Sequence, residues 1–164
     1  MKKIFYFLGL ALLFVHLSMQ AQAPNYLWAQ KSGSVNGISI SAMTVDASGN
    51  SYITGTFRRT VTIAGTLLDA GSGSGMFLAK YDPNGNAVWA KKAVGNDSIL
   101  PQTIAVDANG DIYVGGGFYA TTFTMNSVTL TNSDASTTFT DDFVLKFNSS
   151  GTALWGNKYF SNNF

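Results

Sequence analysis

The residue types that carry most enzymatic chemistry are scarce in this chain. Its 164 residues include no Cys and no Glu, and the single His is His16. General acid, general base or nucleophilic work would fall to nine Asp, supported by Ser, Thr, Tyr and Lys. Asp141 and Asp142 are adjacent, but successive strand residues point to opposite faces and do not form a carboxylate dyad. We therefore assign no catalytic residue; enzymatic activity stays open, with a non-enzyme favoured.

Several of the Asp residues occupy a recurring turn motif. Asp46, Asp82 and Asp107 are each followed three residues later by Gly. The turns at Asp82 and Asp107 superficially resemble an oxygen-rich calcium loop, but no Glu and no third spaced carboxylate complete such a site. An Asp that caps turn amides, before a Gly that accepts positive φ, explains these residues as hairpin turns. We predict hairpins here, with no bound metal and no cofactor.

The elements that must position these residues form an internal repeat. Residues 45–57 match residues 106–118 at a constant offset of 61. Such a period indicates a supersecondary unit that buries its apolar faces only by stacking on copies of itself. The absence of Glu and a charged content of only 12% favour sheet over helix. We expect each unit to have four main strands joined by short antiparallel turns.

Units of this kind, with aromatic and Gly residues at fixed positions, are typical of propeller blades. The pattern Asp-x-x-Gly-Asn-x-Tyr-x-x-Gly-x-Phe at 46–57 and the pattern Phe-x-x-Lys-x-Asp-x-x-Gly at 77–85, with a recurring Trp-Ala, resemble the bacterial β-propeller repeat family (SBBP-type). The resemblance covers nearly all of the chain after residue 23. It implies an all-β fold of β-propeller blades in an exported protein of the Bacteroidota type. It carries over no catalytic site, because the family shares none.

The repeat divides the predicted segment 24–164 into three parts. These are one strand at 25–31 containing Trp28, a unit over about 33–92 and a unit over about 93–160. In a closed propeller, an unpaired strand such as that of Trp28 completes the last blade. Two units and one strand are too few for a ring of about four to eight blades. We expect further blades in a longer protein, several copies that assemble, or sheets that pack in another way.

Residues 1–23 are predicted to be a signal peptide. Lys2 and Lys3 precede an apolar run from Ile4 to Val15, and small residues at 21–23 offer a cleavage site. A run of twelve is well short of the roughly 20 residues that span a bilayer, so no stable membrane span should remain after cleavage. The predicted location is secreted or at the cell surface, with the periplasm open.

The charge of the remaining chain argues against nucleic-acid binding. Without Lys2 and Lys3, eight Lys and Arg face nine Asp, which gives a net charge of −1. Nucleic-acid-binding proteins instead present a clustered basic surface that contacts phosphates. We therefore expect a glycan or protein ligand.

Residues that break the repeat are the better binding candidates, because the kept residues already have structural roles. Arg58 and Arg59 are matched in the second unit by Tyr119 and Ala120. The loop 131–140 is longer than its Gly-rich counterpart 71–75, which we predict to be a flexible loop. We predict a non-enzymatic binding or scaffold module whose loops at one end contact the ligand. The alternative is the propeller part of an exported hydrolase with catalytic residues outside this segment.

Overall fold

The computed structural model describes residues 37–133 and 140–160. The predicted signal peptide and the Trp28 strand lie outside these residues. The described part contains ten strands, so none of its elements is a helix that could cross a bilayer. The strands are β1 (Ile38–Val45), β2 (Ser51–Ile63), β3 (Thr66–Tyr81), β4 (Ala87–Gly95), β5 (Ile99–Val106), β6 (Ile112–Phe118), β7 (Thr122–Met125), β8 (Val128–Thr131), β9 (Asp141–Phe147) and β10 (Ala153–Phe160).

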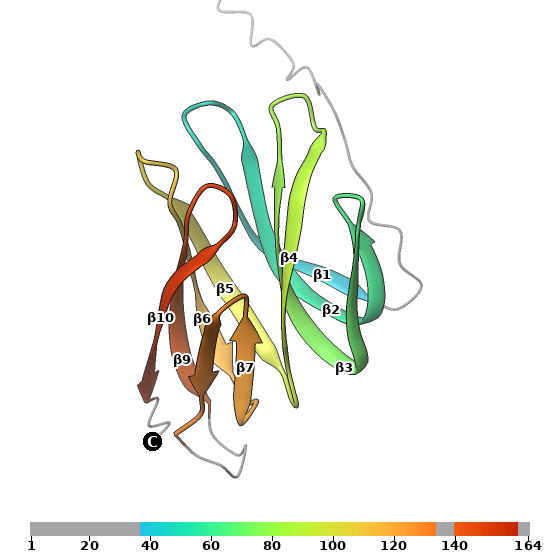
Figure 1. Ribbon diagram of the computed structural model, residues 1–164, viewed down its shortest axis with the longest axis vertical. Coiled ribbons are helices and arrows are strands. Elements are labelled where there is room, and N and C mark those ends of the chain that lie inside the picture. Colours follow the sequence, from blue (N-terminus) through green and yellow to red (C-terminus); the bar gives the residue numbers. More distant parts are fainter. Residues whose placement is uncertain (1–36, 134–139, 161–164) are drawn as a thin grey trace, which may run out of the picture.

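Two antiparallel blades of four strands form the body of the molecule (Figure 1). The first blade has the order β1-β2-β3-β4, and the second has the order β5-β6-β9-β10. Equivalent hairpins keep the same register, since Val45 lies opposite Ser51 in the first blade and Val106 lies opposite Ile112 in the second. The predicted all-β fold of propeller-type blades is confirmed.

A β-ribbon in each unit distinguishes the two blades. In the first unit the ribbon continues β2 and β3, whereas in the second it forms the separate strands β7 and β8. β7 pairs with β4, placing Ala93 opposite Met125 and Gly95 opposite Phe123. The second unit thereby extends the sheet of the first to six strands. This pairing ties the two units together through backbone hydrogen bonds.

The segment 71–75 differs from its prediction as a flexible loop. The structure counts it within β3. Pairing with β2 is interrupted there, because Ser74 lies opposite Arg58 and the next pair joins Asp69 to Thr60. The segment is therefore an irregular bulge of a long strand.

The first blade buries apolar side chains on both faces. The first blade turns Tyr52 and Leu78 toward the second blade, and both share one core with its Phe118 and Phe143. The opposite face of the first blade has a separate core, which includes Phe57 and is covered by its own ribbon. The two sides of β2 are thus both buried over most of its first seven residues.

Two equivalent glycines allow the first two strands of each blade to approach each other closely. A Cβ at Gly55 would lie 2.0 Å from the carbonyl oxygen of Ser39, and one at Gly116 would lie 2.1 Å from that of Leu100. Both sit opposite a register shift in the first strand of their blade. Only glycine fits, because a backbone atom occupies the space of the side chain.

Replacing Gly116 should therefore destabilise the second blade. We expect Gly116→Ala to lower the free energy of unfolding by about 1–3 kcal/mol, the usual cost of overpacking. Urea denaturation measures this change. Gly73→Ala is the matched control, because its Cβ would find its nearest neighbour at 3.6 Å. Equal effects of the two substitutions would contradict the steric explanation.

Candidate binding site between the two blades

The carboxylates of the turn aspartates accept hydrogen bonds from amides of the hairpins that they begin. Asp82 Oδ1 accepts hydrogen bonds from the amides of Asn84 and Asn86 at 2.9 and 2.7 Å. Oδ1 of Asp46 and Oδ1 of Asp107 accept hydrogen bonds from the corresponding backbone amides of their own turns. The described residues contain no group of three His, Cys, Asp or Glu that could hold a metal ion. The observed bonds match the hairpin interpretation of these residues.

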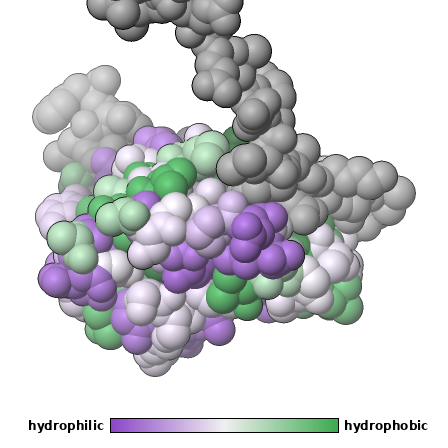
Figure 2. Space-filling model, turned by 90° about the horizontal axis from the view of Figure 1, so that it is seen from above, coloured by the Kyte–Doolittle hydropathy of each residue, from purple (hydrophilic) through white to green (hydrophobic). Residues whose placement is uncertain are grey.

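These turns lie together at one end of the molecule (Figure 1). Figure 2 looks onto this end and shows hydrophilic residues spread between separate hydrophobic patches. The fourth turn uses Asn148 in place of Asp, and its Oδ1 accepts the amides of Ser150 and Thr152 at 3.1 and 3.0 Å. An amide oxygen therefore supports the same turn without a titratable group.

Hydrogen bonding lowers the pKa of Asp82 below its ordinary value of 3.8. The side-chain amide of Asn86 is the largest cause; burial acts in the opposite direction, and the two backbone amides lower the pKa further. A carboxyl group with a lowered folded-state pKa contributes stability above its unfolded pKa. That stability is lost as the pH falls through the folded value.

One substitution should remove the part of the stability loss at low pH that comes from protonation of Asp82. We expect Asp82→Asn, which copies the Asn148 turn, to fold normally and to lose less stability than the wild type between pH 7 and pH 3. The thermal unfolding midpoint at the two pH values measures this loss. The reciprocal change Asn148→Asp should increase the loss. Unchanged pH profiles in both variants would exclude the turn carboxylates as the cause.

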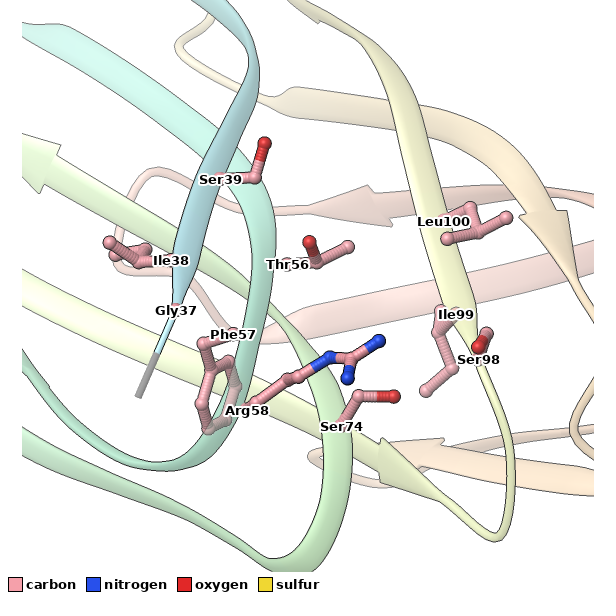
Figure 3. Close-up of a pocket in the computed structure, with 10 residues that line it drawn as sticks. All are labelled: Gly37, Ile38, Ser39, Thr56, Phe57, Arg58, Ser74, Ser98, Ile99 and Leu100. Atoms are coloured by element: carbon pink, nitrogen blue, oxygen red, sulfur yellow. The ribbon is translucent and has the colours of Figure 1, made fainter. Parts of the chain in front are cut away.

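The other end of the blades carries a pocket of about 230 Å³ (Figure 3). It opens between β1 and β2 of the first blade and the start of β5 in the second. Figure 3 shows the Arg58 side chain extending from β2 toward Ser98 and Ile99, with Ser74 beside it. The lining residues are Gly37, Ile38, Ser39, Thr56, Phe57, Arg58, Ser74, Ser98, Ile99 and Leu100.

The charge of the Arg58 guanidinium is unbalanced in this pocket. No carboxylate lines it, and the salt bridges among the described residues join Lys146 to Asp111 and Lys158 to Asp141. The Arg58 main-chain amide donates to the Gly37 carbonyl at 3.1 Å, which fixes the backbone where the side chain departs. The pocket is therefore a positive site with hydroxyl groups on its walls.

A second hollow of about 300 Å³ adjoins the first and shares Arg58 and Ser74 with it. Its other lining residues are Arg59, Ser72, Gly73, Asn96 and Asp97. Arg59 has φ 55°, which is uncommon for a residue with a side chain, at the register shift between β2 and β3. Backbone strain of this kind gathers at functional sites.

The structure thus places both predicted binding residues at one site, with Arg58 the more central. Their counterparts cannot make a second copy of it, since Tyr119 is half-buried and Ala120 is buried beside Gly95. Sequence reasoning missed Thr56, Ser74 and Ser98 as pocket residues, because isolated hydroxyl residues in strands and loops carry no binding motif.

The other sequence candidates contribute nothing to this site. Asp141 is buried and Asp142 is exposed, so their side chains lie on opposite faces of β9. Of the long loop predicted to contact a ligand, residues 134–139 lie outside the described part of the chain.

Comparison with known proteins agrees with the repeat architecture. No protein-family model matches the chain. In an alignment 136 residues long that covers 72% of this chain, the chain is 32% identical to an uncharacterized WD repeat-containing protein of Acanthamoeba polyphaga mimivirus. The chain spans 9% of the length of that relative. The match and the two blades together indicate a repeat protein of β-propeller type.

Proposed function

We propose that this protein is an exported binding module of the bacterial β-propeller repeat type, and that the pocket at Arg58 takes an acidic glycan. The observation that carries the proposal is the unpaired guanidinium between the two blades, in a pocket without a carboxylate. A guanidinium fork pairs well with carboxylate or sulfate oxygens. An anionic group is therefore the ligand chemistry that this pocket favours.

The surroundings of Arg58 favour a sugar as the carrier of that group. Thr56, Ser74 and Ser98 place hydroxyl groups around the pocket, while Asn96 and Asp97 line the adjoining hollow. Hydroxyl and amide groups both donate and accept hydrogen bonds, and a carboxylate accepts them, as sugar hydroxyls require. The carboxylate of Asp97 would repel a second negative charge, which assigns the anionic group to the first pocket and neutral sugar hydroxyls to the second.

Binding should depend on both the acidic group and Arg58. We expect oligogalacturonate to bind in a calorimetric titration and a neutral dextran of equal length not to bind. Arg58→Ala should weaken oligogalacturonate binding roughly tenfold or more, the scale of a lost hydrogen bond to a charged group. Arg58→Lys should restore only part of the affinity, because a lysine cannot form the two-pronged contact.

The control for this experiment is Lys91→Ala, which removes a positive charge outside both hollows. It should leave the affinity unchanged. Binding of oligoglutamate as strong as that of oligogalacturonate would point to a peptide ligand instead. Equal binding of dextran, or an affinity indifferent to Arg58, would refute the proposal.

The proposal of export rests on residues 1–23. Fused to a reporter enzyme that needs disulfides for activity, this segment should produce an active reporter in a Gram-negative host, because disulfides form outside the reducing cytosol. Replacing Leu12 and Leu13 by Lys should abolish that activity by interrupting the apolar run. Reporter activity unaffected by this change would contradict the signal-peptide prediction.

A further inference from the structure

The contact between the two blades is made by two distinct faces. The leading face, which the first blade turns to the second, includes Tyr52 and Trp89, with ring centroids 6.3 Å apart. The trailing face, which the second blade turns to the first, includes Ile104 and Val106. The faces fit closely, since a Cβ at Gly151 would lie 3.0 Å from the Trp89 ring. One leading face and one trailing face therefore make a complete interface.

The second blade carries a leading face of its own. Tyr113 and Trp155 repeat the ring pair at 6.3 Å, and Lys146 Nζ lies 5.1 Å from the Tyr113 ring centre, as Lys80 does from Tyr52. This copy is uncovered, because Trp155 is 40% exposed. Further along the same strand Tyr159 is 57% exposed, whereas its equivalent in the first blade, Ala93, is fully buried. Exposed aromatic residues in one patch mark an interaction surface.

The first blade leaves the part of its trailing face on β1 uncovered, while its own ribbon covers the rest. Met43 is 61% exposed, whereas its equivalent Ile104 is 8% exposed in the contact between the blades. Val45 is exposed, whereas Val106 packs against the shared core. Met43 and Val45 are therefore exposed at places whose counterparts lie in the contact between the blades, whereas Phe57, the counterpart of Phe118, is already buried under its own ribbon.

The strand edges show the same pattern, with one copy of an edge paired at the observed interface and the equivalent edge unpaired. The outer edge of β4 pairs with β7 through Ala93–Gly95 and Phe123–Met125. Within the described chain, β10 has no partner on the equivalent edge, and residues 61–63 of the first ribbon pair only with β3. Open edges of this kind readily add another strand.

From this repetition we infer that the leading face of the second blade docks the trailing face of the first blade in a second copy of this chain. The new contact continues the interface already present between the blades, with Trp155 in the place of Trp89. The edge of β10 at Tyr159 pairs with residues 61–63 of the neighbouring copy. Because the two faces differ, the association is head-to-tail and adds copies in one direction.

Two variants test this inference, each of which places a charged lysine on one of the two faces. Light scattering after gel filtration of the full mature chain should show mass rising with concentration above that of one copy. Met43→Lys spoils the trailing face and Tyr159→Lys the leading face, so each variant alone should stay at the mass of one copy. Both residues are mostly exposed, so both variants should fold, as circular dichroism can verify.

An equimolar mixture of the two variants tests directly whether a leading face binds a trailing face. Each retains the face that the other lacks, so the mixture should form a dimer and nothing larger. Leu67→Lys is the matched control, since this residue is 68% exposed and its equivalent Thr129 stays exposed in the second unit. A wild type that stays at the mass of one copy at every concentration would overturn the inference and leave a unit of another chain, or of a longer one, as the occupant. Association unaffected by the variants, or a mixture that stays unassociated, would also overturn it.

Discussion

A four-stranded sheet that carries apolar side chains on both faces cannot bury them by itself. The rest of the structure depends on this constraint, because other elements must cover those faces. Burying one large apolar side chain contributes about 1.5–3 kcal/mol, so leaving a face uncovered forfeits much of the stability of a small blade. The chain covers one face of the first blade with the second blade and the other with a ribbon. No disulfide supports this arrangement, because the chain contains no Cys. Packing and strand pairing between repeats therefore hold the protein together.

The ribbons show how one repeated element serves two purposes. In the first unit the ribbon folds over a core of its own blade. In the second unit Phe123 and Met125 of the ribbon enter the core between the blades, while their backbone pairs with β4. The rings of Phe118 and Phe123 meet edge-on at 4.9 Å, the contact that aromatic quadrupoles favour. The same element thus supplies both apolar area and hydrogen bonds to the interface.

The candidate binding site follows from the small differences between the units. The counterpart of Arg58 in the second unit is Tyr119, which is half-buried, and the counterpart of Arg59 is Ala120, which is buried. In the first unit Arg58 is exposed, and its side chain extends into the space between the blades (Figure 3). The pocket therefore forms only once, although the framework around it is repeated.

The sequence by itself determined the local elements of this protein. Asp followed by Gly specifies a tight turn through its own hydrogen bonds, and alternating apolar residues specify strands, so the four turns and the pairing of adjacent strands were predictable from short segments. The resemblance of the two units likewise predicted that their blades would be alike. These features depend on neighbours in the chain, which a sequence displays directly.

Only the tertiary structure decided which strand edges and faces meet. No local pattern states that β7 leaves its own blade to pair with β4, or that Ser98 of the second unit stands near Arg58 of the first. The assignment of 71–75 as a loop was wrong for the same reason, since Ser74 and Gly75 pair with β2 and Gly75 also pairs with β4, which makes the stretch part of a long strand. Such contacts join residues far apart in the chain, and their energies come from packing geometry that exists only once both units have folded.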